Sequence, residues 1–251
     1  MGLNKLHGLG LRNFVAPLSS TGLPRVSMIP ASFIISLLQA WVILLVYVDD
    51  IIISGTDSRL ITTLHTVLHA TFHMKDLGCF TYFLGLEVHH TLKGIFLNQH
   101  KCIQDLITLA GLEDTSLVAT PMEVSQFMAS PRHLHLAAVQ CIIRYLRGSP
   151  TRGLFFPTGS MLHLVVYSDA DWAGCPNTRR STSGWCMFLG DALISWKCKK
   201  QDRVSKSSTE ADYRAMSTAC SEVIWLHGLL AELQFPRASS TPLHADNTSA
   251  I

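Results

Sequence analysis

The chain has 251 residues, of which 48% are hydrophobic and 15% are charged, and its formal net charge is +2. This length allows one large domain or two small ones, and the apolar fraction is ample for a buried core. So slight a positive excess does not by itself indicate a nucleic-acid binder. The seven cysteines form no C-x-x-C pair, and their odd number argues against a secreted disulfide framework or a zinc site. We therefore expect reduced thiols and an intracellular protein, cytoplasmic or nuclear.

The N-terminal part is apolar and carries little information. Residues 1–40 are expected to be a poorly ordered leader or an apolar segment. Residues 28–48 carry no charge over 21 positions, which is long enough to span a membrane. Residues 41–48, however, are rich in Val and Leu, as in a buried strand. A membrane anchor over residues 28–48 stays open as an alternative.

Strands and helices alternate over the next hundred residues. Residues 44–55 are two apolar runs around Asp49 and Asp50, a pattern typical of a β-hairpin. Asp57 is expected to cap a helix that runs to residue 72, with Leu60, Leu64, Val67 and Leu68 on one face. The sequence then predicts a hairpin from residues 82–88 and 94–97, a short helix over 101–110 and an amphipathic helix over 134–146.

Three histidines of the helix after Asp57 are spaced four residues apart and could form a metal-binding face: His65, His69 and His73. Polar positions on an amphipathic helix explain this spacing better. We therefore interpret these histidines as surface residues.

A three-stranded antiparallel meander is predicted in the second half of the chain. Residues 163–167 are mostly β-branched or aromatic and lead into Asp169 and Asp171. These two acids point to the same side, because side chains alternate between the faces of a strand. Residues 182–189 and 193–197 are expected to form the next two strands, joined by a turn at Gly190 and Asp191.

A long helix and a short strand follow the meander. Ser207 and Glu210 form a capping box that starts the helix. Apolar residues then recur at three- to four-residue spacing, namely Ala211, Ala215, Ala219, Val223, Leu226 and Leu230. Residues 242–247 read as a strand that ends at Asp246.

Three acids of this half lie at the ends of separate elements: Asp169, Glu210 and Asp246. Element ends that meet can gather carboxylates around two divalent ions roughly 4 Å apart, which activate a water and stabilise the leaving oxygen of a phosphodiester. Alternatively, these are separate solvated acids. The densest basic run lies between them and either meets phosphates or forms a solvated loop: Lys197, Lys199, Lys200, Arg203 and Lys206.

Six motifs of this half, in this order and spacing, resemble the ribonuclease H domain of copia-type retrotransposon polyproteins. They are YSDADWAG (167–174), RSTSG (180–184), ISWK (194–197), SSTEADY (207–213), WL (225–226) and DNTSAI (246–251). The resemblance implies that Asp169, Glu210 and Asp246 are three members of an Asp-Glu-Asp-Asp set that binds Mg²⁺ or Mn²⁺ and cleaves RNA–DNA hybrids. The fourth Asp of the family falls beyond residue 251.

The first half is similar to the reverse transcriptases of the same elements. The motif YVDD (47–50) is followed by MKDLG (74–78), YFLGLEV (82–88), GIFLNQ (94–99) and TPM (120–122). The resemblance implies a polymerase palm in which Asp49 and Asp50 hold the metal ions that align a primer hydroxyl with a nucleotide.

Two departures from this family pattern bear on activity. The palm of the family needs a further Asp on an earlier strand, whereas residues 1–40 contain no Asp or Glu. A block of several dozen residues that separates TPM from SQFM in the family is missing between residues 122 and 125. The missing palm Asp leads us to expect no polymerase activity. Because the fourth Asp of the ribonuclease H set falls beyond residue 251, we expect hydrolysis to be strongly reduced or absent.

The sequence thus predicts an α+β/α/β chain, in which a partial reverse-transcriptase palm precedes a truncated ribonuclease H-like mixed sheet with a long helix. The expected divisions are 1–40 leader or apolar segment, 41–123 palm remnant, 124–160 connection remnant and 161–251 ribonuclease H-like domain, C-terminally truncated. The function expected is that of a retrotransposon relic with impaired catalysis and weak nucleic-acid binding. A working Mg²⁺-dependent nuclease and a membrane-anchored relic are the alternatives.

Overall fold

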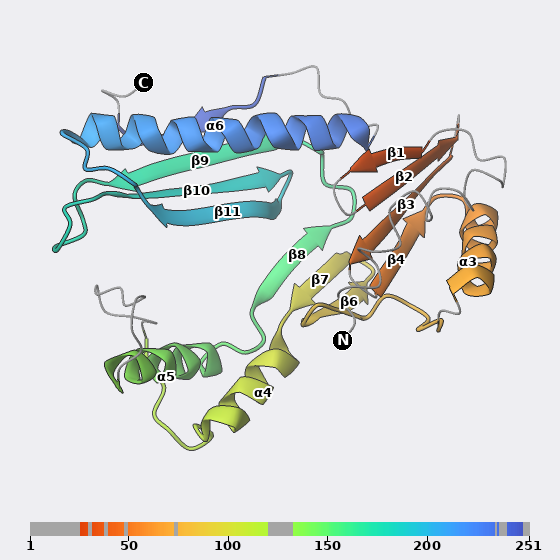
Figure 1. The fold of residues 1–251 in the computed structure, drawn as a ribbon, viewed down its shortest axis with the longest axis horizontal. Helices are drawn as coiled ribbons and strands as arrows, with labels where there is room; N and C mark the ends of the chain where they lie inside the picture. The colour runs from red at the N-terminus through yellow and green to blue at the C-terminus, as the bar shows by residue number, and fades with distance from the viewer. Residues whose placement is uncertain are drawn as a thin grey trace. The chain divides into compact units, whose positions relative to one another are not determined.

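Helices and strands are mixed along the chain, as the sequence predicts. The computed structural model describes residues 26–29, 32–37, 40–47, 50–72, 75–119, 133–233, 235 and 240–247 (Figure 1). The chain divides into two units, residues Met1–Phe80 with Ile224–Ala238 and residues Thr81–Val223 with Ser239–Ile251.

The first unit contains an antiparallel sheet in the order β1-β2-β3-β4. Its strands are β1 (Val26–Ile29), β2 (Ser32–Leu37), β3 (Ala40–Tyr47) and β4 (Asp50–Gly55). The pairing of Tyr47 with Asp50 confirms the hairpin predicted over residues 44–55. Because β1 and β2 fall within residues 1–40, the chain from Val26 on contains strands rather than only a leader.

The helix α3 (Ser58–Phe72) follows this sheet. Asp57 caps it as predicted, since its Oδ1 accepts hydrogen bonds from the backbone N–H groups of Arg59 at 2.9 Å and Leu60 at 3.2 Å. Three leucines of the predicted face, Leu60, Leu64 and Leu68, are buried and form a core with Val42 and Leu44.

The apolar stretch 28–48 contributes to three strands, which leaves the membrane alternative without support. In the described part of this stretch, β1, β2 and β3 pair their backbone groups with neighbouring strands. No helix in the described part of the chain is both long enough and apolar enough to cross a membrane.

In the second unit, one antiparallel sheet has the order β5-β6-β7-β8. Its strands are β5 (Tyr82–Phe83), β6 (Leu86–Thr91), β7 (Gly94–Asn98) and β8 (Gly153–Pro157). The single strand predicted over residues 82–88 is wrong, because the chain turns back at Leu84 and Gly85. Both have positive φ, 50° and 84°, as a two-residue hairpin turn requires.

Two helices lie between β7 and β8 in the sequence, α4 (His100–Ala110) and α5 (His133–Arg147). Both agree with the predicted helices to within about one residue at each end. The C-terminus of α4 is closed by Gly111, whose φ of 62° lets its N–H bond the carbonyls of Ile107 and Thr108.

The other sheet of the second unit carries the site and has the order β11-β10-β9-β12. The strands β9 (Leu164–Asp171), β10 (Thr182–Leu189) and β11 (Ala192–Lys200) form the predicted antiparallel meander, with Gly190 in the turn at a φ of 60°. The short β12 (Leu243–His244) is parallel to β9. This arrangement confirms the three predicted strands and the later short one.

The long helix α6 (Ser208–Glu232) begins at the predicted capping box. Its residues 208–223 run along the β9–β12 sheet (Figure 1). Ala211, Ala215 and Ala219 are fully buried, and small side chains let a helix approach a sheet closely. Alternate residues of β9 and β10, among them Val166 and Met187, are also fully buried and mark the face that packs against α6.

Candidate metal centre and nucleic-acid interface

Three aspartates from three elements converge in the second unit. Asp169 lies in β9, Asp212 in the second turn of α6 and Asp246 two residues after β12. One carboxylate oxygen from each lies within 4.8 Å of the other two, and this is the one such group of metal-ligating side chains in the described ranges. Asp212 is buried, whereas Asp169 and Asp246 are exposed. The group is therefore open to solvent on one side.

The sheet topology explains why these acids meet. Because β12 is parallel to β9, with Leu243 beside Val166 and His244 beside Tyr167, both strands lead to the same edge of the sheet. Asp169 lies two residues after Tyr167, and Asp246 lies two residues after His244. Asp212 reaches the same place from α6. Its Oδ2 accepts a hydrogen bond from Nδ2 of Asn247 at 2.7 Å.

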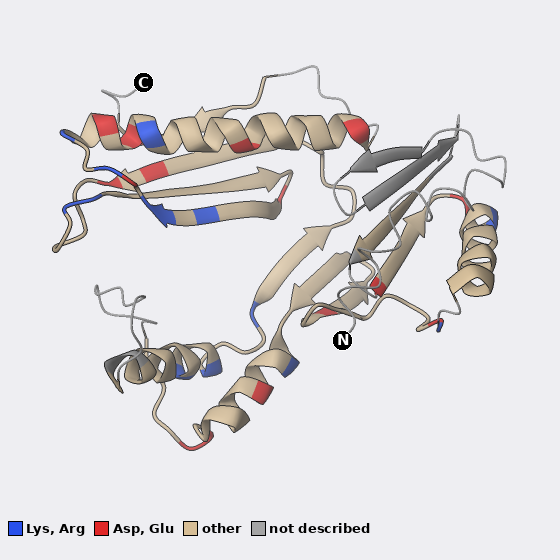
Figure 2. Ribbon diagram, viewed as in Figure 1, with Lys and Arg blue, Asp and Glu red and all other residues tan. Residues whose placement is uncertain are grey.

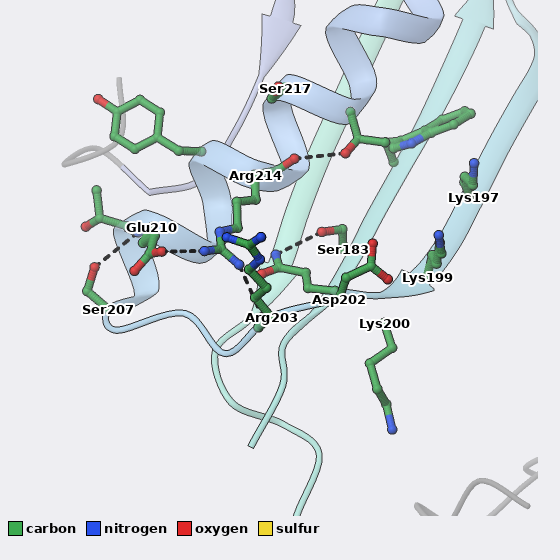
Figure 3. Close-up of a pocket in the computed structure, with 15 residues that line it drawn as sticks. Ser183, Lys197, Lys199, Lys200, Asp202, Arg203, Ser207, Glu210, Arg214 and Ser217 are labelled. Carbon is green, nitrogen blue, oxygen red and sulfur yellow. Dashed lines mark hydrogen bonds and ion pairs between the residues drawn. The ribbon is translucent and has the colours of Figure 1, made fainter. Parts of the chain in front are cut away.

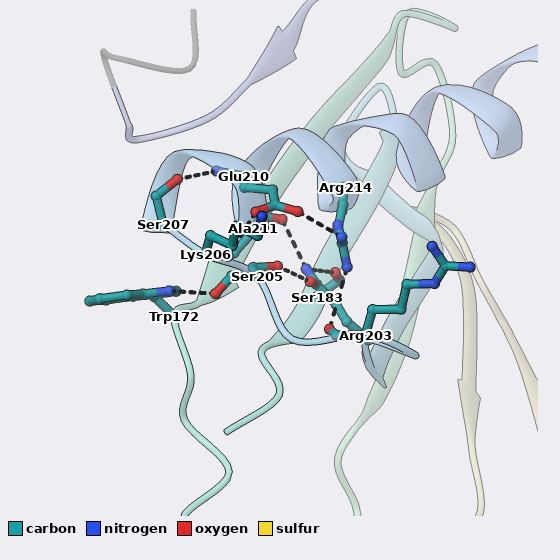
Figure 4. Close-up of polar contacts among 10 residues, drawn as sticks. Trp172, Ser183, Arg203, Ser205, Lys206, Ser207, Glu210, Ala211 and Arg214 are labelled. Atoms are coloured by element: carbon teal, nitrogen blue, oxygen red, sulfur yellow. Dashed lines mark hydrogen bonds and ion pairs between the residues drawn. The ribbon is translucent and has the colours of Figure 1, made fainter. Parts of the chain in front are cut away.

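Glu210 lies outside this group, although the sequence resemblance implied it as a ligand. Its Oε2 accepts a hydrogen bond from the backbone N–H of Lys206 at 2.7 Å, and its Oε1 accepts one from Nη2 of Arg214 at 2.7 Å (Figure 4). Its own N–H donates to Oγ of Ser207 at 3.1 Å, which completes the predicted helix cap. The hydrogen bond from Lys206, and then the charge of Arg214, lower the pKa of this carboxyl group.

Asp212 was not predicted as a site residue, although the sequence contains a signal for it. Two helical residues that are two positions apart project about 200° from each other, so Glu210 and Asp212 cannot serve the same site. Asp212 lies three residues before Ala215 and seven before Ala219, on the buried side of α6. An acid at such an inward position needs a polar or metallic partner.

The three carboxylates fit a hard divalent cation. Adjacent oxygens around Mg²⁺ lie about 3 Å apart, given metal–oxygen distances of roughly 2.1 Å. Modest rotations of these side chains would therefore bring the three carboxylate oxygens close enough to bind one ion. No Lys or Arg in the described ranges forms an ion pair with any of the three. Three neighbouring negative charges repel each other, and a bound cation would offset that repulsion.

The acids of the β3–β4 hairpin are only partly described. Asp50 is exposed and begins β4, and it lines a cavity of about 570 Å³ together with His65 and Asp76. Asp49 and His73 lie outside the described residues. Within the described ranges, the histidines of α3 belong to no group of three or more metal-ligating side chains. His65 instead lies 3.4 Å from Asp76, measured from Nε2 to Oδ2.

A basic groove of about 770 Å³ lies between β11 and α6 in the second unit (Figure 3). Lys197, Lys199 and Arg203 of the predicted basic run line it. Figure 2 shows basic residues along β11 and along the segment that leads from it to α6. Arg214 of α6, which was not among the predicted basic residues, also lines the groove.

Two members of the predicted basic run do not direct their charge into the groove. The Lys200 side chain points away from it, and its Nζ lies 3.0 Å from Sγ of Cys175 (Figure 3). Lys206 is absent from the groove lining, and its described role is the backbone hydrogen bond to Glu210.

Comparison with known proteins identifies relatives of this chain. Residues 22–124 match the sequence model of reverse transcriptase (RNA-dependent DNA polymerase). The retrovirus-related Pol polyprotein from transposon RE1 of Arabidopsis thaliana is 34% identical over 87% of this chain and 18% of its own length. An uncharacterized mitochondrial protein of Arabidopsis thaliana is 34% identical over 72% of this chain and 93% of its own. The chain belongs to the Pol polyproteins of copia-type retrotransposons.

The relation to these polyproteins is partial in length. The Pol polyprotein from transposon TNT 1-94 of Nicotiana tabacum is 30% identical over 84% of this chain but 20% of its own length. The chain thus spans about a fifth of the Pol polyproteins that it matches. No solved structure matches it.

Proposed function

We propose that residues 161–247 form a ribonuclease H-like module that binds Mg²⁺ or Mn²⁺ and the backbone of an RNA–DNA hybrid. The convergence of Asp169, Asp212 and Asp246 carries this proposal. The antiparallel meander, the long helix and the later short strand that surround these acids were each predicted from the sequence, and they support this proposal. The basic groove beside α6 offers cations to phosphates.

The chemistry of the module rests on these three acids. A divalent ion bound there would polarise a phosphodiester and lower the pKa of a coordinated water. Asp212 is the buried ligand, and Asn247 orients its carboxylate. Asp169 and Asp246 are exposed, so a phosphate can approach from their side.

Hydrolysis by this module is proposed to be slow. A fourth acid does not join the three aspartates within the described residues. Asp171, on the same side of β9 as Asp169, instead accepts a hydrogen bond from the backbone N–H of Thr182. Three carboxylates can hold one divalent ion more readily than they can hold two ions. In a two-metal mechanism the second ion stabilises the leaving oxygen. Rapid cleavage is the alternative, in which one ion suffices.

The reverse-transcriptase-like segment is proposed to lack polymerase activity on its own. It retains the β3–β4 hairpin, but residues 1–40 supply no third acid to hold the catalytic ions.

Metal binding and cleavage by the full chain test the module separately. Electron paramagnetic resonance of free Mn²⁺ should show binding by the wild type, and Asp212→Asn should abolish it. Glu210→Gln should leave Mn²⁺ binding unchanged, because Glu210 is engaged with Arg214 and Lys206. The opposite pattern, in which only Glu210→Gln loses Mn²⁺, would overturn the assignment. Rapid cleavage of a labelled hybrid that Asp169→Asn abolishes would favour the active-nuclease alternative.

A further inference from the structure

The two walls of the basic groove present cations to each other. Lys197 and Lys199 are two positions apart in β11 and therefore lie on one face, about 7 Å apart along the strand. They pair with Trp185 and Ser183 of β10, whose side chains are buried on the face that packs against α6. The opposite wall is α6, which contributes Arg214.

Arg214 is held in place before any ligand binds. Its Nη2 donates to Oε1 of Glu210 at 2.7 Å, and its Nη1 donates to the carbonyl oxygen of Arg203 at 3.4 Å (Figure 4). Its side chain is 35% exposed. A guanidinium group has five N–H donors, so these two hydrogen bonds leave other donors for an anion. A fixed guanidinium loses less side-chain entropy when it binds a phosphate.

A buried donor also lies in the groove wall. Trp185 lines the groove, and its indole nitrogen has no hydrogen-bond partner among the described residues. An unpaired buried N–H is unfavourable, so a site for a ligand oxygen nearby would explain it.

We infer that this groove holds the sugar-phosphate backbone of one nucleic-acid strand, and that Arg214, positioned by Glu210, binds one of its phosphates. The inference rests on the proposed function and assigns Glu210 a role different from metal binding. Lys197 and Lys199 contact neighbouring phosphates of the same strand from the β11 side. The negative charge that remains in the groove, on Asp202 and Glu210, is outnumbered by the cationic side chains.

The groove and the metal centre lie on different flanks of α6. Arg214 and Asp212 are two residues apart and so project about 200° from each other. The phosphate at Arg214 is therefore not the one at the metal. The helix is about 10 Å wide, so a hybrid that spans its first turns can place one strand at the carboxylates and the other in the groove.

Hybrid binding by the full chain, measured by fluorescence anisotropy in EDTA, tests this inference without cleavage. Arg214→Ala should weaken binding about tenfold. It should also reduce the slope of log Kd against log salt by about one phosphate contact. Alanine favours a helix, so α6 should remain folded. Arg152→Ala is the matched control, because Arg152 is exposed and does not line the groove.

Glu210→Gln separates positioning from simple charge. If Glu210 positions Arg214, its replacement should weaken hybrid binding about threefold or more, although it removes a negative charge. If the groove acts through net charge alone, the same replacement should tighten binding, and the inference is then wrong. If Arg214→Ala binds the hybrid as tightly as the wild type, the inference about Arg214 is also wrong, whereas the proposed metal centre is unaffected. Absence of hybrid binding by the wild type would instead refute the proposed function as well.

Discussion

Asn247 donates a hydrogen bond from its Nδ2 to Oδ2 of Asp212, with 2.7 Å between the two atoms. This contact joins the segment after β12 to the second turn of α6. It holds the buried carboxylate of the proposed metal centre in one orientation, as partners of metal ligands commonly do.

Replacement of Asn247 should therefore weaken metal binding without removing a ligand. Asn247→Ala is expected to lower the affinity for Mn²⁺ about tenfold, because Asp212 loses the partner that orients it. Titration with Mn²⁺, followed by paramagnetic resonance, measures the change. Asn177→Ala is the control, since Asn177 is exposed in the β9–β10 connection. An affinity equal to that of the wild type would show that Asn247 does not orient the ligand.

The core of the first unit offers a test of stability. Leu64 is fully buried among Val42, Leu44, Leu60 and Leu68. Leu64→Ala should destabilise this unit by about 2–5 kcal/mol, since it removes buried methyl groups and leaves a cavity. Hydrogen exchange of α3 peptides measures the loss. Leu77→Ala should change exchange little, because Leu77 is 78% exposed.

Two glycines should respond to the same substitution with opposite signs. Gly190 has a φ of 60° in the β10–β11 turn, and a Cβ there would overlap Ser160. Gly190→Ala should destabilise the chain by about 1 kcal/mol or more. Gly228 lies within α6, where an added Cβ meets nothing within 4 Å. Gly228→Ala should stabilise the helix by up to about 1 kcal/mol. Urea denaturation followed by circular dichroism compares the two; equal signs would contradict this explanation.

Cys175 should react as a thiolate at neutral pH. A hydrogen bond from the Thr178 side chain, and next one from Lys200, lower the pKa of its thiol from 9.0 to about 6. The ionised form therefore predominates above pH 6, and the rate of alkylation should fall as the pH drops through that value. Peptide mass spectrometry after brief iodoacetamide treatment measures this rate. Thr178→Ala should move the midpoint to higher pH, and a wild-type midpoint above pH 8 would contradict the prediction.

Much of the fold could be predicted because its elements have local signals. The cap at Asp57, the turn at Gly190 and the start of α6 at Ser207 each depend on a few neighbouring residues. The turn at Leu84 and Gly85 escaped prediction because a leucine with positive φ is unusual, and nothing in its side chain favours that conformation.

The candidate site was predicted only in part, because its membership depends on contacts between distant elements. Asp169 and Asp246 follow strands, and strand ends can be recognised in a sequence. Glu210 and Asp212 are neighbours in one motif, and only their direction around α6 separates a helix cap from a buried carboxylate. Arg214 was missed because a helical arginine is ordinary until the opposite wall of the groove is known.

The strand β11 lies at the outer edge of its sheet, so its lysines also affect how copies of the chain can associate. An edge strand exposes unpaired backbone groups that can dock onto the same edge of another molecule, and like charges keep such copies apart. Lys197, Lys199 and Lys200 would bring three positive charges from each copy into that contact. Solubility should therefore decrease as salt screens these charges, and polyanions that bridge them should promote self-association.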